Sequence, residues 1–218
     1  MRALITGGSG AIGTALVREF ASDYEVIFTY LNNDAASRKL EKETGARGIK
    51  CDVRNRENIS EIIKQYPHFD LLINNAGISR IKLFTDITSD EWDEMLDVNL
   101  TGAFNFTQAV LPSMLRRQSG VIVNVSSVWG EIGASCEVHY SAAKAGLIGL
   151  TKALAKEVGP MGVRVLYIAP GAVESPMNGG FSEDELLAAC PDGKVGKPED
   201  VAEQIRQMVQ NAVSADMT

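Results

Sequence analysis

The chain has 218 residues, 45% of them hydrophobic, and a formal net charge of -7. This length fits one domain with a substantial core, and the negative charge argues against nucleic acid or an anionic membrane as a main partner. The three cysteines, Cys51, Cys136 and Cys190, are scattered, which predicts no disulfide frame and no metal site. No apolar stretch is as long as a membrane span, and Met1-Arg2 leads straight into strand-like residues, so we expect a cytoplasmic protein without a targeting segment.

Short apolar runs alternate with longer helical patterns along the whole chain. The expected strands are Ala3–Thr6, Glu25–Tyr30, Gly48–Cys51, Leu71–Asn74, Gly120–Val125 and Arg164–Ile168. The expected helices are Ile12–Ser22, Asp34–Thr44, Glu57–Tyr66, Ser89–Met114, Tyr140–Val158 and Pro198–Asn211, of which Ser89–Met114 is either continuous or broken. This alternation predicts one doubly wound α/β domain over residues 1–218, with a mostly parallel sheet covered on both faces.

A long region rich in Gly, Pro and Ser follows the last expected strand. It contains a short acidic helix, Glu183–Ala189. Open α/β sheets bind ligands beyond the carboxyl ends of their strands. The region therefore predicts a substrate lid over residues 176–195, with an ordinary surface loop as the alternative.

A glycine-rich loop joins the first expected strand to the first helix. Its sequence is Thr6-Gly7-Gly8-Ser9-Gly10-Ala11-Ile12-Gly13. Gly7 permits a tight turn, small residues let the backbone approach a pyrophosphate, and the helix N-terminus faces the anion. Because strand, loop and helix follow in the required order, the loop predicts dinucleotide binding rather than a glycine turn without a ligand.

The residues after the second strand bear on the choice of dinucleotide. Leu31-Asn32-Asn33 lacks the acid that usually accepts a hydrogen bond from the ribose 2′-hydroxyl of NAD. Asp34 comes later, and we expect it to cap the next helix. The missing carboxylate leaves room for a 2′-phosphate, to which Arg38 or Lys39 could offer charge. The sequence favours NADP over NAD, although Gly10 and Leu31 are not basic.

Polar residues also follow the third and fourth strands. Asp52 could accept a hydrogen bond from an adenine amino group or cap a helix. Asn74-Asn75-Ala76-Gly77 suits a close backbone approach to the cofactor, although such turns are common. Asn99 lies inside an expected helix, shortly before Gly102. Because Asn is a mediocre helix former, we expect a local distortion there that presents a functional amide.

Three further side chains suggest chemistry at a carbonyl group. Tyr140 and Lys144 stand four residues apart, so a helix places them on one face, and Ser127 follows a buried strand. A phenol, an ammonium and a hydroxyl suit proton donation to a carbonyl oxygen while hydride reaches its carbon. The ordinary phenol pKa of about 10 has to fall for acid-base work at neutral pH, and a neighbouring ammonium can lower it.

Together these motifs resemble the short-chain dehydrogenase/reductase family. The matching residues follow the family's order over almost the whole chain: Thr6-Gly7 to Gly13, Asp52-Val53, Asn74 to Gly77, Asn99, Ser127, Tyr140 with Lys144, and Pro170-Gly171. The resemblance implies a Rossmann-type oxidoreductase in which Ser127 binds the substrate carbonyl and Tyr140 is the general acid. It also implies that Lys144 holds the nicotinamide ribose and lowers the Tyr140 pKa, and that Asn99 anchors a water of a proton relay. We prefer Ser127 to Ser126 because of its spacing from Tyr140, and because adjacent strand side chains point to opposite faces.

The resemblance implies a cofactor-binding set as well. Its members are Gly7, Ser9, Ala11, Ile12, Gly13, Asn32, Asp52, Val53, Asn75, Ala76, Gly77, Tyr140, Lys144, Pro170, Gly171, Val173 and Ser175. Ala11 replaces a loop glycine of the family, and Ser175 keeps a hydroxyl where the family tends to carry Thr. The family usually continues beyond the position of Thr218 into a final strand, which we expect to be missing here. A homodimer or homotetramer is the expected assembly.

Two ketone substrates and one non-enzymatic role remain open. Tyr140-Ser-Ala-Ala-Lys-Ala-Gly is similar to bacterial 3-oxoacyl-acyl-carrier-protein reductases, which implies a carrier-bound acyl thioester. Acidic carriers need a basic rim, to which Arg116 and Arg117 could contribute. The segment from Trp129 to Tyr140 resembles reductases of the 5-aminopentanone group on modified elongation factor P, so Glu131 or Glu137 could face an amine or be a solvated loop acid. A dinucleotide sensor without turnover is the third possibility, against which the intact catalytic set argues.

Overall fold

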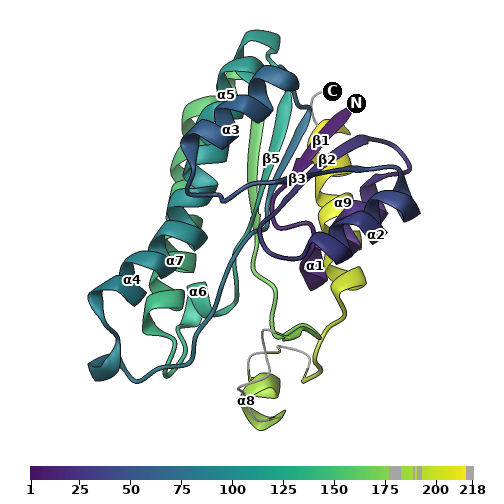
Figure 1. The fold of residues 1–218 in the computed structure, drawn as a ribbon. Helices are drawn as coiled ribbons and strands as arrows, with labels where there is room; N and C mark the ends of the chain where they lie inside the picture. Colours follow the sequence, from purple (N-terminus) through teal and green to yellow (C-terminus); the bar gives the residue numbers. More distant parts are fainter. Residues whose placement is uncertain (177–182, 189, 191–192, 215–218) are drawn as a thin grey trace.

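Residues 1–176, 183–188, 190 and 193–214 are described in the computed structural model of the chain (Figure 1). They contain one six-stranded sheet in the order β3-β2-β1-β4-β5-β6, and every neighbouring pair of strands is parallel. The strands are β1 Arg2–Ile5, β2 Glu25–Tyr30, β3 Arg47–Lys50, β4 Leu71–Asn74, β5 Gly120–Val125 and β6 Val163–Ile168. The predicted doubly wound α/β fold is confirmed.

Helices cover both faces of this sheet. They are α1 Ala11–Phe20, α2 Asp34–Thr44, α3 Arg56–Gln65, α4 Ser89–Leu96, α5 Gly102–Arg117, α6 Trp129–Ile132, α7 Val138–Val158, α8 Glu183–Ala188 and α9 Pro198–Ser214. Short turns of other helix types lie at η1 Phe84–Asp86, η2 Asp97–Thr101 and η3 Gly159–Met161. Figure 1 shows α3, α4, α5 and α7 on one side of the sheet, with α1, α2 and α9 on the other.

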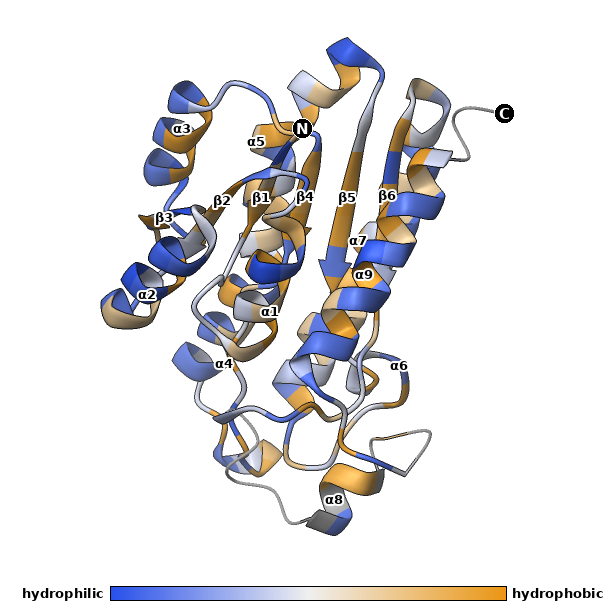
Figure 2. Cartoon of the chain, turned by 90° about the vertical axis from the view of Figure 1, so that its right-hand side faces the viewer, coloured by the Kyte–Doolittle hydropathy of each residue, from blue (hydrophilic) through white to orange (hydrophobic). Residues whose placement is uncertain are grey.

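The central strand β1 contributes to two apolar clusters, one on each face. Ala3 and Ile5 pack in the cluster that includes residues of α1 and α9, whereas Leu4 packs in the cluster that includes residues of α3 and α5. Successive side chains of a strand point to opposite faces, so a strand covered on both sides is apolar throughout. Figure 2 shows this apolar colour along the middle strands and alternating polar and apolar stripes on α9.

Two local features bear on the sequence-based expectations. The helical region expected from Ser89 to Met114 is divided by η2, a π-helical turn, into α4 and α5, so the distortion expected at Asn99 is confirmed. The cap of α2 is Asn33, whose side-chain oxygen accepts a hydrogen bond from the Ala36 backbone N–H at 3.0 Å. The expectation that Asp34 caps this helix is therefore wrong. The Asp34 carboxylate instead accepts hydrogen bonds from the Tyr30 hydroxyl and the Lys50 ammonium.

The order of the strands opens a crevice at the carboxyl ends of β1 and β4. The crossover from β1 leads to β2 on one side, while β4 pairs with β1 on the other side. Chain segments that leave adjacent strands in opposite directions leave a gap, and open α/β sheets bind their ligands there. The fold thus brings the glycine-rich loop after β1 next to the asparagine-rich turn after β4.

The region after β6 is described only in part. Of the expected lid over residues 176–195, residues 177–182, 189 and 191–192 lie outside the described residues, so the lid stays a prediction. Val173 forms an isolated parallel bridge with Gly196, which holds the two ends of the region together. Among the described residues no strand follows α9, and no described helix is long and apolar enough to cross a membrane.

Candidate active site

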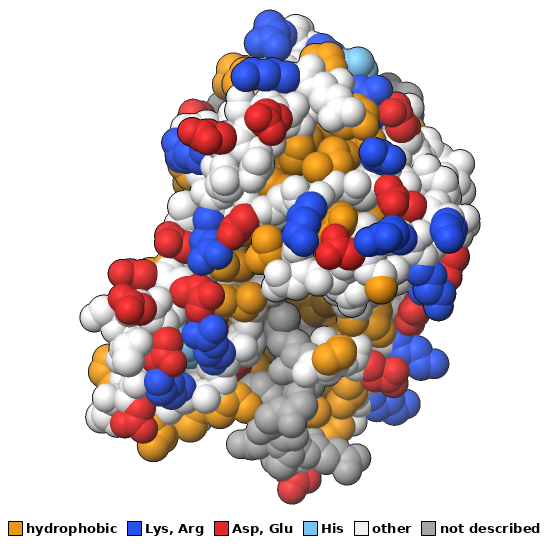
Figure 3. Space-filling model, viewed as in Figure 1, with side chains coloured by type: hydrophobic (Ala, Val, Ile, Leu, Met, Phe, Trp, Pro, Cys, Tyr) orange, Lys and Arg blue, Asp and Glu red, His pale blue; other side chains and the backbone are white. Residues whose placement is uncertain are grey.

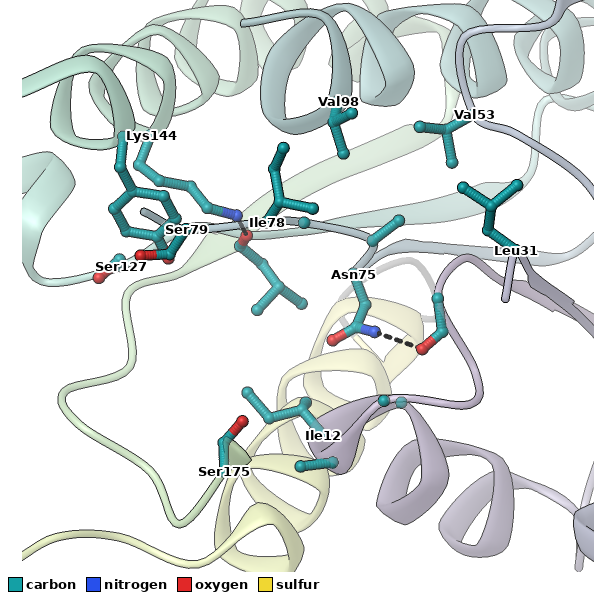
Figure 4. A pocket seen from close by; sticks show the side chains of 18 of the residues that line it. Ile12, Leu31, Val53, Asn75, Ile78, Ser79, Val98, Ser127, Lys144 and Ser175 are labelled. Atoms are coloured by element: carbon teal, nitrogen blue, oxygen red, sulfur yellow. Dashed lines mark hydrogen bonds between the residues drawn. The ribbon is translucent and has the colours of Figure 1, made fainter. Parts of the chain in front are cut away.

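A cavity of about 680 Å³ occupies the crevice at the carboxyl ends of the strands. Every member of the cofactor-binding set predicted from the sequence lines it, and so does Ser127. Figure 4 shows Ser79, Ser127 and Lys144 gathered at one end, with Leu31 and Val53 at the other. The cavity therefore has a nucleotide end and a reactive end, joined by the loops that follow β1 and β4.

Side chains that directly follow β1 and β4 hold the glycine-rich loop in place. The Thr6 hydroxyl accepts hydrogen bonds from the backbone N–H groups of Asn75 and Ala76, both at 3.0 Å. The Asn75 side-chain amide donates to the backbone oxygens of Thr6 and Gly7, at 3.0 and 3.3 Å (Figure 4). Asn75 thus positions the loop. Asn74, by contrast, is buried in the sheet and donates to Thr107 and Asn124, which makes it a structural residue.

The loop leaves the N-terminus of α1 exposed toward the cavity. A Cβ atom on Gly13 would lie 2.1 Å from the Gly7 backbone oxygen, so only glycine allows this close packing of loop against helix. No side chain caps the first turn of α1. The first backbone N–H groups of a helix then remain available to an anion, and the helix dipole favours negative charge there. The loop fits the pyrophosphate of a dinucleotide.

An ion pair lies at the nucleotide end of the cavity. Asp52 accepts hydrogen bonds from the Arg54 guanidinium, at 3.0 Å from Nε to Oδ1 and 2.6 Å from Nη2 to Oδ2. Hydrogen bonds from Arg54 hold the pKa of Asp52 below its ordinary value. Asn55, not Asp52, caps α3, because its side-chain oxygen accepts from the backbone N–H groups of Glu57 and Asn58. Arg54 was missed in the sequence, although it follows the Asp52-Val53 motif directly.

The carboxyl end of β5 and the first turns of α7 bring Ser127, Tyr140 and Lys144 together. Their exposed fractions are 9%, 9% and 4%, so all three are buried. The Ser127 hydroxyl accepts a hydrogen bond from the Trp129 backbone N–H at 3.2 Å. The Lys144 ammonium donates to the Val125 backbone oxygen at 2.8 Å and lies 5.6 Å from the centre of the Tyr140 ring. Ser126 points elsewhere, because its hydroxyl donates to the Lys144 backbone oxygen.

Burial dominates the electrostatics of this group. It raises the pKa of the Tyr140 phenol above its ordinary value, Glu137 adds to the increase, and the hydrogen bond with Ser127 opposes it. Burial also lowers the pKa of Lys144 to about 8. The sequence-based hypothesis expected Lys144 to lower the pKa of the Tyr140 phenol. In the protein alone this pKa is raised instead. The desolvation of both groups outweighs the attraction between ammonium and phenolate.

Asn99 lies at the distortion between α4 and α5. Its side-chain oxygen accepts from the Ile78 N–H at 3.2 Å, and its amide donates to the backbone oxygens of Ile78 and Met95, each at 3.0 Å. A Cβ atom on Gly77 would lie 2.6 Å from the Asn99 side-chain oxygen and 3.5 Å from the Lys144 nitrogen. Asn99 thus supports the loop after β4 from behind, close to Lys144. Its role as an anchor for a water stays a prediction.

A buried carboxyl group lies beside Tyr140. Glu137 has no exposed surface, and its Oε1 accepts a hydrogen bond from the Ser79 hydroxyl, which lines the cavity. Burial raises the pKa of Glu137 to about 7. Glu137 is therefore neither a solvated loop acid nor a wall of the cavity, whereas Glu131 is exposed. Ser79 was missed in the sequence, although it stands two residues after Gly77.

Two other positions complete the description of the cavity and its surroundings. Trp129, in α6, lines the cavity, and its ring lies edge-to-face on the Tyr140 ring with 6.4 Å between the ring centres.

Arg117 lies in the last turn of α5, where it donates to the Phe69 backbone oxygen and pairs with Asp70, just before β4. The expectation that Arg117 belongs to a basic rim at the active-site mouth is wrong. Because α5 runs against the strands, its last turn lies at their amino ends, away from the cavity.

Comparisons with known proteins agree with this geometry. A family model described as short chain dehydrogenase matches residues 1–186. A 3-oxoacyl-[acyl-carrier-protein] reductase of Synechocystis sp. is 35% identical over 99% of this chain and 92% of its own length. An acetoacetyl-CoA reductase of Rhizobium meliloti is 39% identical over 92% of this chain and 87% of its own length.

A solved structure is similar over nearly the whole fold. The crystal structure of a 3-oxoacyl-[acyl-carrier protein] reductase from Brucella melitensis superposes with a TM-score of 0.85 at 34% identity. The match covers 94% of this chain and 82% of the other.

Proposed function

The chain belongs to the short-chain dehydrogenase family, and we propose that it reduces a ketone to a secondary alcohol with a nicotinamide dinucleotide as the hydride donor. One observation carries this proposal. Ser127, Tyr140 and Lys144 lie together at one end of a cavity that is also lined by the glycine-rich loop after β1 and, at its other end, by Leu31 and Val53. A ketone held at the reactive end would meet a proton donor and the reduced ring together.

The residues present fit a dinucleotide. The N-terminus of α1 has no side-chain cap, and Gly7, Gly13 and Asn75 shape a loop close enough for backbone contact with a pyrophosphate. When bound, the nicotinamide supplies the hydride for the carbonyl carbon. Lys144, at the reactive end, is the residue that would hold the adjoining ribose.

The hydroxyl groups would act on the carbonyl oxygen. Ser127 and Tyr140 can both donate a hydrogen bond to that oxygen, and Tyr140 transfers its proton as negative charge develops there. A raised pKa keeps the Tyr140 phenol protonated before the reaction, which suits reduction. Lys144, with its pKa lowered to about 8, can return a proton to the phenolate near neutral pH.

We infer that the dinucleotide is NADP. The residues after β2 that line the nucleotide end are Leu31, Asn32 and Asn33, none of which is acidic. The carboxylate of Asp52 is already paired with Arg54. Arg54 lines the cavity, whereas Arg38 lies on α2 and lines a separate hollow together with Asp34 and Lys39. Calorimetry should give tighter binding of NADPH than of NADH, and Arg54→Ala or Arg38→Ala should reduce that preference. Equal affinities for the two dinucleotides in the wild type would refute this choice.

The substrate proposed first is a 3-oxoacyl thioester. The Synechocystis and Brucella relatives are 3-oxoacyl-[acyl-carrier-protein] reductases by name, and the Rhizobium relative is an acetoacetyl-CoA reductase. Figure 3 shows acidic and basic side chains interspersed over the viewed face, and Arg117 lies at the wrong end of the sheet for an acidic carrier. A thioester on a small carrier such as coenzyme A is therefore expected to react at least as well as one on a carrier protein.

The test is a panel of substrates whose reduction is measured through the oxidation of NADPH. It should contain a 3-oxobutanoyl thioester on coenzyme A, the same group on an acyl carrier protein, and elongation factor P that carries a 5-aminopentanone group. The proposal expects turnover of a ketone in this panel by the wild type and its loss in Tyr140→Phe. Turnover that survives Tyr140→Phe would refute the catalytic assignment. Binding of NADPH with no reduction of any ketone would favour the sensor.

A further inference from the structure

Glu137 is a buried acid that its surroundings leave only half satisfied. Its side chain has no exposed surface, its Oε1 accepts from the Ser79 hydroxyl, and its Oε2 has no hydrogen-bond partner in the part of the chain that the structure describes. A charged carboxylate in such a place costs more free energy than a neutral carboxylic acid. Burial accordingly raises the pKa of Glu137 to about 7, so the protonated acid is populated at neutral pH.

The charged groups of the neighbouring elements are engaged with other partners. Two salt bridges join the loop after β4 to α4, and the buried ammonium of α7 donates to a backbone oxygen: Arg80–Glu94, Lys82–Glu91 and Lys144–Val125. The titratable neighbours on α7 are His139, whose pKa burial lowers, and Tyr140, whose pKa burial raises. Both are neutral near pH 7, so neither gives Glu137 a countercharge.

The protonation state of Glu137 decides what Ser79 offers to the cavity. Ser79 lines the cavity together with Ser127 at the reactive end (Figure 4). A serine hydroxyl has one proton and two acceptor lone pairs, an ionised carboxylate only accepts, and a protonated one also donates. When Glu137 is ionised, Ser79 gives its proton to the carboxylate and presents only lone pairs to a ligand. When Glu137 is protonated, it can donate to Ser79, whose own proton is then free.

The substrate proposed above carries an acceptor that the catalytic residues do not use. A 3-oxoacyl thioester has a ketone and a thioester carbonyl, which are separated by one carbon. Ser127 and Tyr140 are assigned to the ketone oxygen, which leaves the thioester oxygen close by without a donor. An acceptor that loses water and finds no donor weakens binding. The Ser79 hydroxyl lies at the same end of the cavity and fits this need.

We propose that Ser79 donates a hydrogen bond to the thioester oxygen of a 3-oxoacyl substrate, and that protonated Glu137 is the positioning residue that leaves the Ser79 proton free for it. This inference rests on the proposed ketone reduction and names the residue that distinguishes a 3-oxoacyl thioester from a simple ketone. A neutral hydrogen bond of this kind changes affinity by about fivefold. Because the Glu137 pKa is raised to about 7, the distinction is present at lower pH and lost as pH rises through 7.

Two ketones that differ at one carbon measure this contribution. S-(3-oxobutanoyl)-N-acetylcysteamine is the thioester, and S-(3-oxobutyl)-N-acetylcysteamine carries CH₂ in place of the thioester carbonyl. The readout is the ratio of kcat/KM for the thioester to kcat/KM for the thioether. Effects of Tyr140, Lys144 or the dinucleotide act on both ketones and cancel in this ratio. Enolisation of the thioester changes with pH alike for every variant, so each variant is compared with the wild type at pH 6 and again at pH 8.

At pH 6 the ratio should be about fivefold lower in Ser79→Ala than in the wild type, but unchanged in Ser79→Thr and Glu137→Gln. At pH 8 the wild type should fall to the level of Ser79→Ala, whereas Glu137→Gln should stay about fivefold higher, because its amide can donate to Ser79 at either pH. The exposed controls Ser135→Ala and Glu157→Gln should follow the wild type throughout. Equal ratios in the wild type and Ser79→Ala at pH 6, or a Glu137→Gln ratio that falls with the wild type, would overturn the proposal.

Binding separates this inference from the proposed reaction. Calorimetry with the two ketones on the enzyme loaded with NADP⁺ measures affinity without turnover. Tighter binding of the thioester at pH 6, lost in Ser79→Ala, without reduction of either ketone would support the subsite and refute the reductase. Reduction of both ketones with a ratio that Ser79→Ala leaves unchanged would overturn the subsite and leave the reductase intact. Thermal unfolding reports whether each variant folds, and Ser79→Ala carries the test at both pH values if Glu137→Gln does not fold.

Discussion

Replacement of Lys144 by Met tests how strongly burial acts on the active site. Burial lowers the pKa of this ammonium from 10.5 to about 8. A difference of about 2.5 pKa units corresponds to about 3 kcal/mol, by which the charged form destabilises the folded protein below pH 8. The Val125 backbone oxygen would lose its partner in Lys144→Met, which offsets about 1 kcal/mol. We therefore expect Lys144→Met to be about 2 kcal/mol more stable than the wild type at pH 7.

The sign of the pH dependence follows from the same shift. Between about pH 8 and 10.5 the unfolded chain binds the proton and the folded chain has lost it, so wild-type stability gains from this group as pH rises through that window. The advantage of Lys144→Met should thus shrink toward pH 10. Equilibrium urea unfolding of both proteins at pH 7 and pH 10 measures it, with Lys156→Met, an exposed residue of α7, as the control. A Lys144→Met protein less stable than the wild type at pH 7 would refute the reasoning, whereas its activity is expected to be lost in either case.

Three further changes test other parts of the site. Gly13→Ala places a Cβ atom 2.1 Å from the Gly7 oxygen, so calorimetry should show NADPH affinity reduced at least tenfold; wild-type affinity would exclude the loop as the binding element. Ser127→Ala should lower kcat by about tenfold or more, whereas Ser126→Ala should cost about 1 kcal/mol of stability and spare kcat; the reverse result would exchange their roles. For Glu137, a folded-state pKa raised from 4.5 to about 7 means stability that is present at low pH and lost as pH rises through that window, by up to about 3 kcal/mol. Urea unfolding at pH 5 and pH 8 should show this loss in the wild type but not in Glu137→Gln, and parallel curves would contradict it.

Local sequence patterns were enough to locate the frame of the site. The apolar runs placed β1, β2, β4, β5 and β6 to within one residue at each end, because strands covered on both faces of a parallel sheet are largely apolar. The edge strand β3, with the sequence RGIK, was placed equally well although it is partly exposed. The glycine-rich loop and the polar residues that end the strands meet because parallel strands share one carboxyl edge. Asn99 indicated the distortion around it, since this mediocre helix former, shortly before Gly102, occupies a π-helical turn.

Properties that depend on tertiary surroundings could not be predicted in this way. The position of Arg117 depends on the direction of α5 relative to the sheet, which places it beside Asp70. The burial of Glu137 depends on the loop that carries Ser79, which is far away in the sequence. The raised Tyr140 pKa follows from desolvation by the surrounding structure, which the four-residue spacing to Lys144 does not encode. At α2, competition between Asn33 and Asp34 for the cap was decided by contacts of Asp34 with Tyr30 and Lys50.

Transfer of deuterium to a ketone from NADPH that carries deuterium at both C4 positions tests the central claim most directly. The wild type should place the label on the carbinol carbon of the product. Mass spectrometry of the product from a single turnover detects the label. Tyr140→Phe should bind NADPH equally well but transfer the label about 100-fold or more slowly, because it lacks the proton donor. Equal transfer rates in the two proteins, or product alcohol without the label, would contradict the account.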